Sequence, residues 1–438
     1  MTLTTDGQVA VDADRWRPGK TFGLDVPADA EALLAGGTDF LTRAFRASGA
    51  LSADNRVSRI VAWREFHGGG TGKKMLVTVT YDRPGEGLPE ELFVKFSRNF
   101  DNELWDSGRH LMTSEVSFAV LSRASTFPVP VPTLLFADID PETDTGLIVT
   151  ECIPYGMNGV EPHYVKCMDY AVPDQVGHYK AILRGLARLS GTHRAGGLSP
   201  GFDREFPYDS KGPSAFRGGV PEDKILQRAT RLFEFIDRYP QLFPDNVRSA
   251  EFREQFLRDL PDVVAAGEGI RAVLRGNPDL IAFAHWNANI DNCWFRPGPD
   301  GLLEAGFLDW ANAGQLSVAQ SITGAISGAE TFIWDDHLDE LLTVFIEEYA
   351  ARGGPELDLH ELRLHVLLNT ASGLAHSMGA PLAIAREVED VGALESSRDS
   401  RLSEHENARI QLHMTTKLLN VWQTRGLGDV VRALAGAR

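Results

Sequence analysis

Residues that could do chemistry are concentrated in one short stretch, AHWNANIDNCWF, at residues 284–295. It places His285, Asn287, Asp291 and Asn292 in one loop, between two apolar runs that predict strands. Imidazole and carboxylate groups can transfer protons, and carboxylate and amide oxygens can bind a hard cation such as Mg²⁺. Taken alone, the loop is explained as well by a polar turn between strands as by a catalytic role.

A further carboxylate follows in GFLDWANAG, residues 306–314, where Asp309 ends an apolar run. An acid in that place can hold Mg²⁺ against phosphate groups, and Asn292 could supply a second oxygen ligand. The simpler interpretation is that Asp309 caps the N-terminus of a helix.

The segment FHGGGTGKK, residues 66–74, lies between two predicted strands. Glycine has no Cβ, so backbone N–H groups in such a loop can approach phosphate oxygens closely. The glycines concerned are Gly68, Gly69, Gly70 and Gly72. A plain glycine hairpin explains this segment equally well.

Lys95 interrupts the apolar run ELFVKFS, which predicts a strand. A buried ammonium group needs an anionic partner, and a nucleotide phosphate together with a helix carboxylate would supply one. Glu115, in the predicted helix that follows, is the natural carboxylate. The alternative is an edge-strand lysine that reaches solvent.

The elements that must position these residues fall into two groups. Several β-like runs lie before residue 150, and helical periodicity dominates after about residue 175. A helix is predicted to begin at Thr38 as its cap, and a hinge is predicted near Glu151. The sequence therefore predicts an α+β, two-lobed fold with an N-terminal extension at 1–37, an antiparallel sheet lobe at 38–150 and a helical lobe at 151–438.

Composition narrows the function classes. The 438 residues carry 43 basic and 61 acidic side chains, a net charge of −18, which disfavours nucleic acid and anionic membranes as partners. No apolar run approaches the ~18 residues of a membrane helix. The N-terminus has no signal-peptide pattern, and the three cysteines lack disulfide or zinc spacing. These features predict a cytoplasmic protein with reduced thiols.

Taken in order along the chain, these motifs resemble the aminoglycoside phosphotransferase and choline kinase superfamily. HWNANIDN matches the position of its catalytic loop H-G-D-x-x-x-x-N, and FLDW matches the end of its metal-binding strand. The sheet region, with GGGTG, TYD, GLPEELFVKF and EVSF, is most similar to the ecdysteroid kinase-like branch. The resemblance runs from about Thr38 to Gly373 and implies a two-lobed kinase-like fold.

The resemblance also implies roles for single residues. Asn292 and Asp309 would bind Mg²⁺, and Glu151 would lie where the hinge backbone meets the adenine. His285 would bond backbone near Asp309. ATP would be held by the glycine-rich loop, the strand lysine and the helix glutamate, which are Gly68, Gly69, Gly70, Gly72, Lys95 and Glu115.

Two positions depart from the family pattern. Asn287 stands where the family has its catalytic Asp, and Trp286 stands where it has Gly. No acid follows the D-W pair between Ala311 and Ala329, where family members tend to have one. A positioned base contributes ~10²- to 10⁴-fold, whereas charge neutralisation and positioning supply most of the acceleration in phosphoryl transfer. Asn287 would then orient the acceptor hydroxyl, and its proton would leave on the phosphate or go to Asp291 or His285.

The prediction is an ATP- and Mg²⁺-dependent phosphotransferase that acts on a hydroxyl of a small molecule. The alternative is an inactive nucleotide-binding pseudokinase with a regulatory or binding role, and a third option is nucleotidyl transfer. The segment GAETFIWDDHLDELL, residues 328–342, could supply Trp334 and Asp335 to bind a cationic acceptor. Trp286, Trp294 and Trp310 could favour a bulky hydroxylated one. A solvated helix face and core packing are the simpler interpretations of these residues.

Overall fold

The computed structural model describes residues 15–66, 72–85, 87–209 and 221–436. Its contacts divide the chain into two compact units. Unit 1 contains Met1–Asn158, Leu198–Phe206 and Phe307–Ala313, and unit 2 contains Gly159–Gly197, Pro207–Gly306 and Gly314–Arg438. Each unit is described by itself.

Unit 1 is built on a five-stranded antiparallel sheet with the order β3-β4-β5-β7-β6. Side chains alternate between its two faces, as the period of a strand requires. On one face Met75, Val77 and Val79 of β4 are buried together with Val94 of β5. The strands are β3 (Val57–Phe66), β4 (Lys73–Tyr81), β5 (Glu91–Phe96), β6 (Leu134–Asp140) and β7 (Thr145–Glu151).

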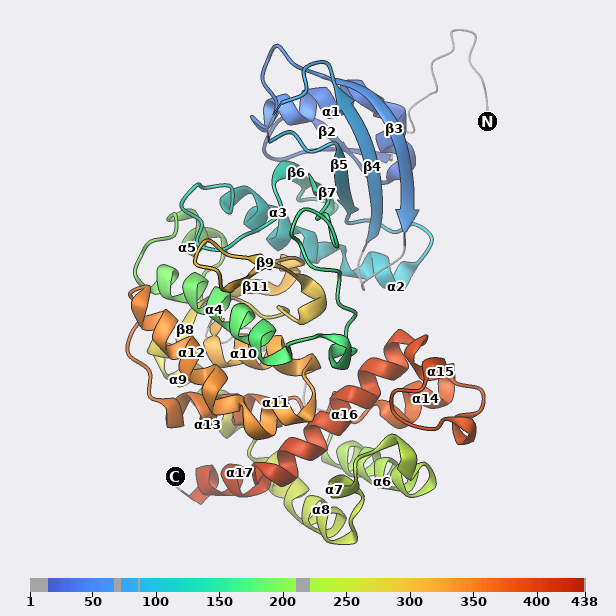
Figure 1. Cartoon of the computed structure of the whole chain (residues 1–438), viewed down its shortest axis with the longest axis vertical. Coiled ribbons are helices and arrows are strands. Elements are labelled where there is room, and N and C mark those ends of the chain that lie inside the picture. The colour runs from blue at the N-terminus through green and yellow to red at the C-terminus, as the bar shows by residue number, and fades with distance from the viewer. Residues whose placement is uncertain (1–14, 67–71, 86, 210–220, 437–438) are drawn as a thin grey trace. The chain divides into compact units, whose positions relative to one another are not determined.

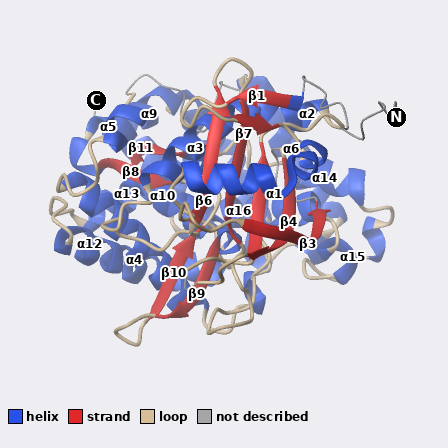
Figure 2. Cartoon of the chain, turned by 90° about the horizontal axis from the view of Figure 1, so that it is seen from above, coloured by secondary structure: helices blue, strands red, loops and turns tan. Residues whose placement is uncertain are grey.

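Helix α1 (Ala30–Ala47) covers that buried face, with Phe40 and Phe45 in the same apolar cluster. Figure 2 shows it lying across the strands. Helix α1 consists of two helical segments that meet at Gly37, whose φ of 54° and ψ of −147° are not helical. The second segment begins at the predicted Thr38, and the first, which the sequence analysis did not predict, begins after Asp29, whose side chain caps it.

Helix α3 (Met112–Leu121) packs on the opposite face of the sheet, where Met112 and Val116 meet Ile148 of β7. Glu115 lies on the same helix and is buried. Short elements complete the unit: β1 (Trp16–Pro18), β2 (Asp25–Pro27), α2 (Glu103–Asp106), α5 (Gly201–Glu205) and the 3₁₀ turn η7 (Trp310–Asn312).

Unit 2 is mainly helical. Helix α4 (Gln175–Arg194) packs against α12 (Leu338–Ala351) and α10 (Val318–Ala325), and α16 (Glu406–Thr424) packs against α14 (Ala380–Glu387) (Figure 1). The other helices are α6 (Glu222–Arg238), α7 (Asp245–Arg248), α8 (Ala250–Ala265), α9 (Gly267–Gly276), α11 (Thr331–Asp336), α13 (Leu359–Ser372), α15 (Ser400–Ser403) and α17 (Leu427–Gly436).

Short strands carry the polar loop of unit 2. β8 (Ile281–His285) pairs with β11 (Ala313–Ser317), and β9 (Cys293–Pro297) pairs with β10 (Leu303–Phe307). The loop between β8 and β9 holds the residues singled out from the sequence, as predicted from the apolar runs on either side. The α+β class, with an antiparallel sheet and a mainly helical part, is confirmed.

The predicted domain boundaries stay a prediction. The compact units divide first at Asn158 and not at residue 150, and they assign two later segments, 198–206 and 307–313, to the unit that holds the sheet. The second of these segments contains Asp309. Asp309 therefore belongs to the same unit as the sheet, although it is far from the strands of the sheet in the sequence.

Candidate functional site

Lys95 is the centre of a buried ion cluster in unit 1. Its side chain is 5% exposed, and its Nζ donates hydrogen bonds to both carboxylate oxygens of Glu115, at 2.9 and 2.7 Å. It also donates to Oδ1 of Asp309, at 3.3 Å. The prediction that Glu115 is the carboxylate partner of Lys95 is therefore confirmed, and β5 is an inner strand of the sheet and not an edge.

The charged groups of this cluster attract one another. Burial by itself lowers the pKa of Lys95, but the carboxylates of Glu115 and Asp309 outweigh it and hold that pKa above the usual value. Lys95 is therefore a fixed cation. Because an ammonium group has three N–H donors, bonds to Glu115 and Asp309 aim it in a defined direction.

Asp309 reaches Lys95 because the residues around it are fixed on α3. The Trp310 ring stacks on the Phe118 ring, with centroids 3.8 Å apart and an angle of 12°. The Trp310 Nε1–H donates to the Phe307 carbonyl at 3.1 Å, and the Phe307 N–H donates to the Pro130 carbonyl at 3.0 Å. Asp309 itself has φ 57°, and its side chain makes no capping bond. Asp309 thus occupies the N-cap position of η7, as the simpler interpretation has it, but its side chain does not cap the turn.

The side chain of Asp309 is 39% exposed, so a carboxylate held by a buried lysine also faces outward. Hard oxygen donors of this kind suit Mg²⁺. The donor chemistry of Asp309 therefore fits the predicted metal. No group of three or more His, Cys, Asp or Glu residues with metal-site geometry occurs among the described residues.

Lys74 is a second lysine of this site that sequence reasoning did not single out. It lies directly opposite Lys95 in the pairing of β4 with β5. Burial, and then the charge of Lys95, lower the pKa of Lys74 to about 8. Its neighbours on the same face include Leu76 and Phe93. These two residues pair with each other two residues further along the strands and are only half-buried. The face thus combines two ammonium groups with an apolar strip.

Gly72 is the one member of the predicted glycine-rich loop in the described residues. It has φ 61°, and a Cβ there would lie 1.9 Å from the Phe96 carbonyl oxygen. A side chain is therefore excluded by the close approach of β5 and by the backbone conformation. Gly68, Gly69 and Gly70 lie outside the described residues, so their predicted role in phosphate binding stays a prediction.

Glu151 ends β7, and its groups are engaged within unit 1. Its N–H donates to the Thr133 carbonyl at 2.9 Å, and its carbonyl accepts from the Thr150 hydroxyl at 3.0 Å. Its carboxylate accepts from the N–H and the hydroxyl of Thr133, at 2.8 and 2.9 Å. These bonds fix the chain that leaves the sheet, and contact with adenine stays a prediction.

His285 stabilises the polar loop of unit 2. It is fully buried at the end of β8, and its Nδ1 accepts a hydrogen bond from the Asn287 N–H at 3.2 Å. Its carbonyl accepts from the Ser321 hydroxyl of α10 at 2.8 Å. The imidazole therefore bonds backbone of the loop, and its predicted bond to backbone near Asp309 stays a prediction.

Asn287 belongs to a chain of hydrogen-bonded neutral side chains. Its Oδ1 accepts a hydrogen bond from Asn289 Nδ2 at 2.8 Å, and Asn289 Oδ1 accepts from the Ser327 hydroxyl at 2.6 Å. Asn289 is 5% exposed, so this relay is largely shielded from water. The relay from Ser327 through Asn289 fixes the orientation of the Asn287 carboxamide.

Asn292 and Asp291 turn to different neighbours. Asn292 Nδ2 donates to the Asn287 carbonyl at 2.8 Å, which closes the loop and leaves its oxygen end directed away from that bond. The carboxylate of Asp291 lies 4.0 Å from Lys166 Nζ, and the Asp291 carbonyl accepts from His163. The side chain of Asp291 is 17% exposed. This geometry ties Asp291 to the segment before α4, so we do not assign it the role of base.

The predicted acceptor residues are structural. Trp334 is fully buried, and the Asp335 carboxylate accepts hydrogen bonds from Asn420 and Thr424 of α16. The pocket predicted from Trp334 and Asp335 was therefore wrong, because both side chains face α16. Trp294 and Trp310 are 6% and 4% exposed and belong to the core, as the simpler interpretation held.

Sequence reasoning missed a second buried polar group, in unit 2. Asp169 is fully buried, its Oδ2 accepts a hydrogen bond from the Tyr179 hydroxyl, and among the described residues its Oδ1 has no partner. Burial raises the pKa of Asp169 to about 7. Lys417 of α16 is 4% exposed, and burial lowers its pKa to about 8. No spacing pattern in the sequence singles out Asp169 and Lys417, because they are far apart in the chain.

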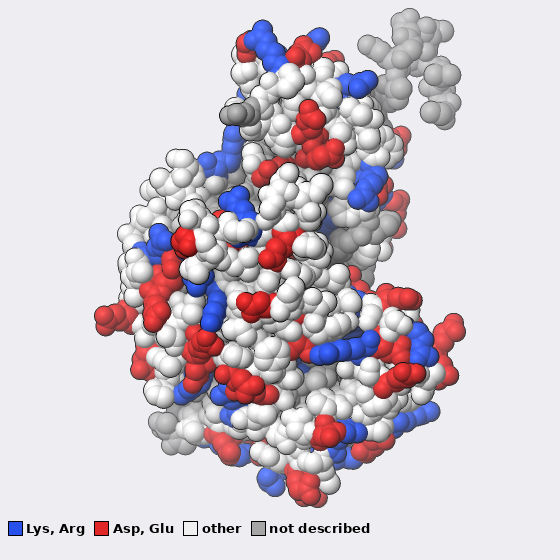
Figure 3. Space-filling model, viewed as in Figure 1, with Lys and Arg blue, Asp and Glu red and all other residues white. Residues whose placement is uncertain are grey.

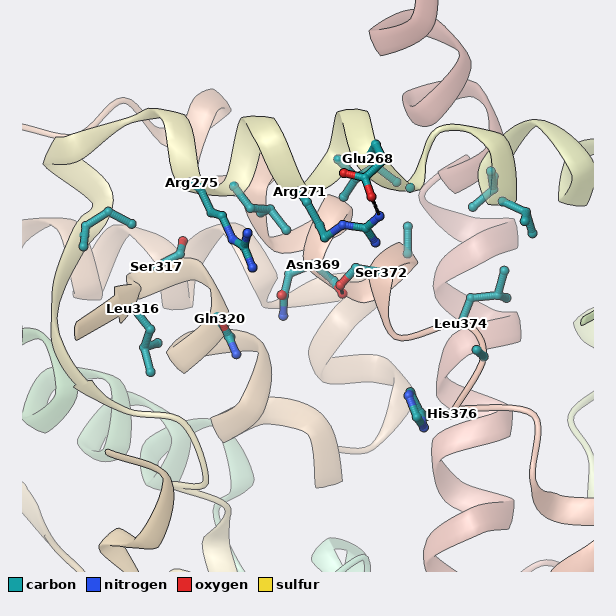
Figure 4. Close-up of a pocket in the computed structure, with 18 of the residues that line it drawn as sticks. Glu268, Arg271, Arg275, Leu316, Ser317, Gln320, Asn369, Ser372, Leu374 and His376 are labelled. Carbon is teal, nitrogen blue, oxygen red and sulfur yellow. Dashed lines mark hydrogen bonds and ion pairs between the residues drawn. The ribbon is translucent and has the colours of Figure 1, made fainter. Parts of the chain in front are cut away.

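Unit 2 also contains a cavity of about 300 Å³ beside α9, shown in Figure 4. Arg271 and Arg275, one turn apart on α9, point into it, and Arg271 is paired with Glu268. Gln320 and Asn369 line the other side. None of the predicted site residues lines this cavity, so it is separate from the polar loop.

The surface is mixed in charge. On the face shown in Figure 3, acidic and basic side chains are interspersed. Among the described residues, no helix has the length and apolar composition needed to cross a membrane.

Comparison with known proteins gives structural neighbours only, since no family model and no curated protein matches the chain. A choline kinase from Cryptosporidium parvum Iowa II has a TM-score of 0.41 and 13% identity, with 84% of this chain and 91% of that chain covered. An ethanolamine kinase from Plasmodium vivax has a TM-score of 0.41 and 12% identity over 90% and 89%.

A spectinomycin phosphotransferase in complex with ADP and spectinomycin has a TM-score of 0.40 and 11% identity over 86% and 94% of the two chains. These structural neighbours are two small-molecule kinases and one antibiotic phosphotransferase. At these identities and TM-scores, function has to be argued from the residues of this chain.

Proposed function

We propose that the protein is a phosphotransferase that uses a nucleoside triphosphate, most simply ATP, and Mg²⁺ to phosphorylate a hydroxyl group of a small molecule. The observation that carries this proposal is the buried cluster of Lys95, Glu115 and Asp309. Burying charged groups such as Lys95 and Glu115 costs several kcal/mol per ion, so such a pair is weak evidence for stability. Binding of an anionic ligand explains the presence of this cluster better.

Each member of the cluster has a task in this reaction. Lys95, aimed by Glu115, would bind phosphate oxygens, and the outward carboxylate of Asp309 would hold the metal, with Asn292 as the proposed second ligand. Mg²⁺ bound there would neutralise charge on the phosphates. The bond between the γ-phosphorus and the oxygen that bridges it to the nucleoside diphosphate breaks, a bond to the acceptor oxygen forms, and the acceptor proton leaves to water.

Asn287 orients the acceptor hydroxyl in this proposal and does not remove its proton. An amide oxygen has two lone pairs, and Asn289 uses one of them. The relay from Ser327 holds this oxygen in place, so it can accept a hydrogen bond from the hydroxyl. Loss of the base costs ~10²- to 10⁴-fold, which leaves the larger contribution of phosphate and metal binding intact.

The alternative, a nucleotide-binding protein without turnover, is favoured by the same relay. A carboxamide that is fixed by neutral side chains has no proton acceptor of its own. The two functions predict the same nucleotide binding, and they differ only in whether product forms.

A thermal-shift titration of the full chain with ATP, GTP and Mg²⁺, followed by phosphorus NMR with a panel of hydroxylated metabolites, tests the proposal. Metal-dependent stabilisation together with ADP or GDP and a new phosphate ester would support it. Stabilisation without product would favour the alternative, and no stabilisation by any nucleotide would refute both.

A further inference from the structure

The cavity beside α9 lies within unit 2, between α9, α13 and the point where β11 leads into α10 (Figure 4). Its volume of about 300 Å³ is that of a small-molecule site and is many times the ~10–15 Å³ that one water molecule needs. None of the candidate residues of the polar loop lines it. An inference about this cavity therefore does not rest on the proposed function.

Ser317 places an unsatisfied hydroxyl group at the cavity. It stands at the N-cap position of α10, where a serine side chain ordinarily accepts a hydrogen bond from a backbone N–H, but it makes no such bond. Ser317 is 6% exposed, and among the described residues its Oγ has no partner. Ser321, one turn further along α10, shows the usual outcome, since its hydroxyl donates to the His285 carbonyl.

Asn369 of α13 presents a second group of this kind. It lines the cavity and is 4% exposed, and its side-chain amide makes no hydrogen bond to any described residue. Its neighbour Thr370 is equally buried, but the Thr370 hydroxyl donates to the Val366 carbonyl at 3.0 Å. A buried amide without a hydrogen bond is destabilising. A polar group inside the cavity would therefore stabilise both Asn369 and its surroundings.

The N-terminus of α10 favours a negative charge on that group. Ser317 and Gln320, at the N-cap and in the first turn of α10, both line the cavity, so the start of this helix borders it. The N-terminus is the positive end of the helix dipole and has unpaired backbone N–H groups. Neither an acidic residue in the first turn nor a side-chain cap balances it here.

Two arginines add positive charge from the facing helix. Arg271 and Arg275 point from α9 into the cavity, toward Asn369 (Figure 4). Arg271 pairs with Glu268, but the Glu268 side chain is 89% exposed, and exposed pairs of this kind contribute little to stability. Asp209, the other carboxylate of the lining, is exposed as well. An anion inside the cavity could therefore replace Glu268 as the partner of Arg271 at small cost.

The remaining lining is largely apolar. Ile225 of α6, Val263 of α8 and Ile270 of α9 border the cavity and are at most 5% exposed. A wall of buried aliphatic side chains together with a few polar groups is the usual composition of a small-molecule site. The occupant therefore needs an apolar part as well as an anionic one.

We propose that this cavity is a binding site for a small organic carboxylate. Its apolar part packs on the aliphatic wall, and its carboxylate accepts hydrogen bonds from the Arg271 guanidinium and the Asn369 amide. The two oxygens of a carboxylate match the paired N–H donors of a guanidinium group. The Ser317 hydroxyl and the N-terminus of α10 supply further donors to the same ligand.

Ligand-observed NMR titration of the full chain with butyrate, benzoate, benzamide and inorganic phosphate tests the proposal. Benzamide has the shape of benzoate without its charge, and phosphate has charge without an apolar part. We expect benzoate to bind with a Kd on the order of 1 mM, as befits a ligand of few atoms, and benzamide and phosphate to bind at least about fivefold more weakly. If neither carboxylate shows saturable binding, the cavity holds only water and the proposal is refuted.

Matched variants locate the bound carboxylate. Arg271→Gln should weaken benzoate binding about 10-fold, as the loss of a charge-assisted hydrogen bond does, and Glu268→Gln should leave it equal or tighter. Arg248→Gln is the control. Arg248 of α7 pairs with the exposed Asp245 at the same spacing in the sequence but does not line the cavity, so this variant should change the Kd by less than about twofold.

Asn369→Leu, which keeps a similar volume without polar atoms, should also weaken benzoate binding about 10-fold. Unchanged binding in both Arg271→Gln and Asn369→Leu would place the ligand elsewhere and refute the site. An equal loss in Arg248→Gln and Arg271→Gln would refute it too, because the effect would then follow net charge alone. Should circular dichroism show that Asn369→Leu does not fold, Arg271→Gln decides the test, since that side chain is 36% exposed.

Discussion

The candidate polar residues of the two units differ in charge. In unit 1 the candidate residues are charged, with buried Lys95 between buried Glu115 and the partly exposed Asp309. In unit 2 the Asn287 side chain, in the loop after β8, is oriented by neutral groups, through the relay from Ser327 and Asn289. Charge is therefore retained where an anion would bind and is absent at the position where a base would act.

This difference indicates which substitutions each site can tolerate. A buried charge needs its partners in full, whereas an amide relay can exchange one neutral oxygen for another at small cost. Variants that test the comparison should accordingly have large effects in unit 1 and small effects in unit 2.

The largest effect is expected at Asp309. Asp309→Asn removes the charge that would hold the metal and keeps a residue that tolerates φ near 57°. We expect turnover to fall by at least about 10³-fold, since charge stabilisation dominates phosphoryl transfer, while the protein stays folded. Steady-state assay and circular dichroism measure the two effects. Full turnover in this variant would eliminate the proposed metal ligand.

The next effect is on stability. Glu115→Gln removes the closest carboxylate from a fully buried lysine, and breaking such a pair costs about 3–5 kcal/mol of unfolding free energy, moderated here because Asp309 remains. Urea denaturation measures it. Glu254→Gln, an exposed glutamate on α8, is the control and should change stability by less than about 0.5 kcal/mol. An equal, small effect of both would show that the cluster is not energetically coupled.

A smaller effect is expected at Asn287. A carboxylate at this position can still accept the hydrogen bond from Asn289, so Asn287→Asp should change stability by less than about 1 kcal/mol. Turnover should rise by up to about 10²-fold, or stay unchanged if the base is not limiting. Rapid-quench measurement of the phosphorylated product distinguishes these results. A fall in turnover in the folded variant would show that the amide itself is required.

The last effect is a change in the pH dependence of stability in unit 2, at Asp169, with no change expected near pH 4. Burial raises the pKa of Asp169 from 3.8 to about 7, so the folded state binds the proton more tightly than the unfolded state. Below about pH 4 this group costs nothing, and the cost grows as pH rises to about 7.

Asp169→Asn removes the titration and can still accept the bond from the Tyr179 hydroxyl. We expect the variant to gain about 1–3 kcal/mol over the wild type at pH 7 and above, and nothing near pH 4. Urea titrations at several pH values measure this difference. A constant difference across the range would mean that the carboxylate does not titrate there.

Local pattern was enough to predict some of the site. Strand periodicity placed Lys95 inside a sheet, and helical spacing placed Glu115 on the helix that follows, so their ion pair could be inferred. The loop from His285 to Asn292 was located by the apolar runs on either side. These predictions succeeded because each depended on one element or on two adjacent ones.

Contacts between distant elements could not be predicted. The partnership of Lys74 with Lys95 depends on strand register, which the hydrophobic pattern of a single strand does not specify. Trp334 and Asp335 looked accessible on an isolated helix, and only the packing of α16 buries them. Asn289 and Ser327 join across 38 residues, a separation without any local signal.

The left-handed backbone of Asp309 restricts which mutations this position can accept. At φ 57° a β-branched or bulky side chain is strained, and only Gly, Asn and Asp adopt that conformation readily. In a saturation library scored for folding alone, position 309 should therefore retain only these residues, and scoring for activity should then reduce the set to Asp. Position 309 must therefore satisfy both a backbone requirement for folding and a carboxylate requirement for activity. Comparing the two libraries would separate these requirements.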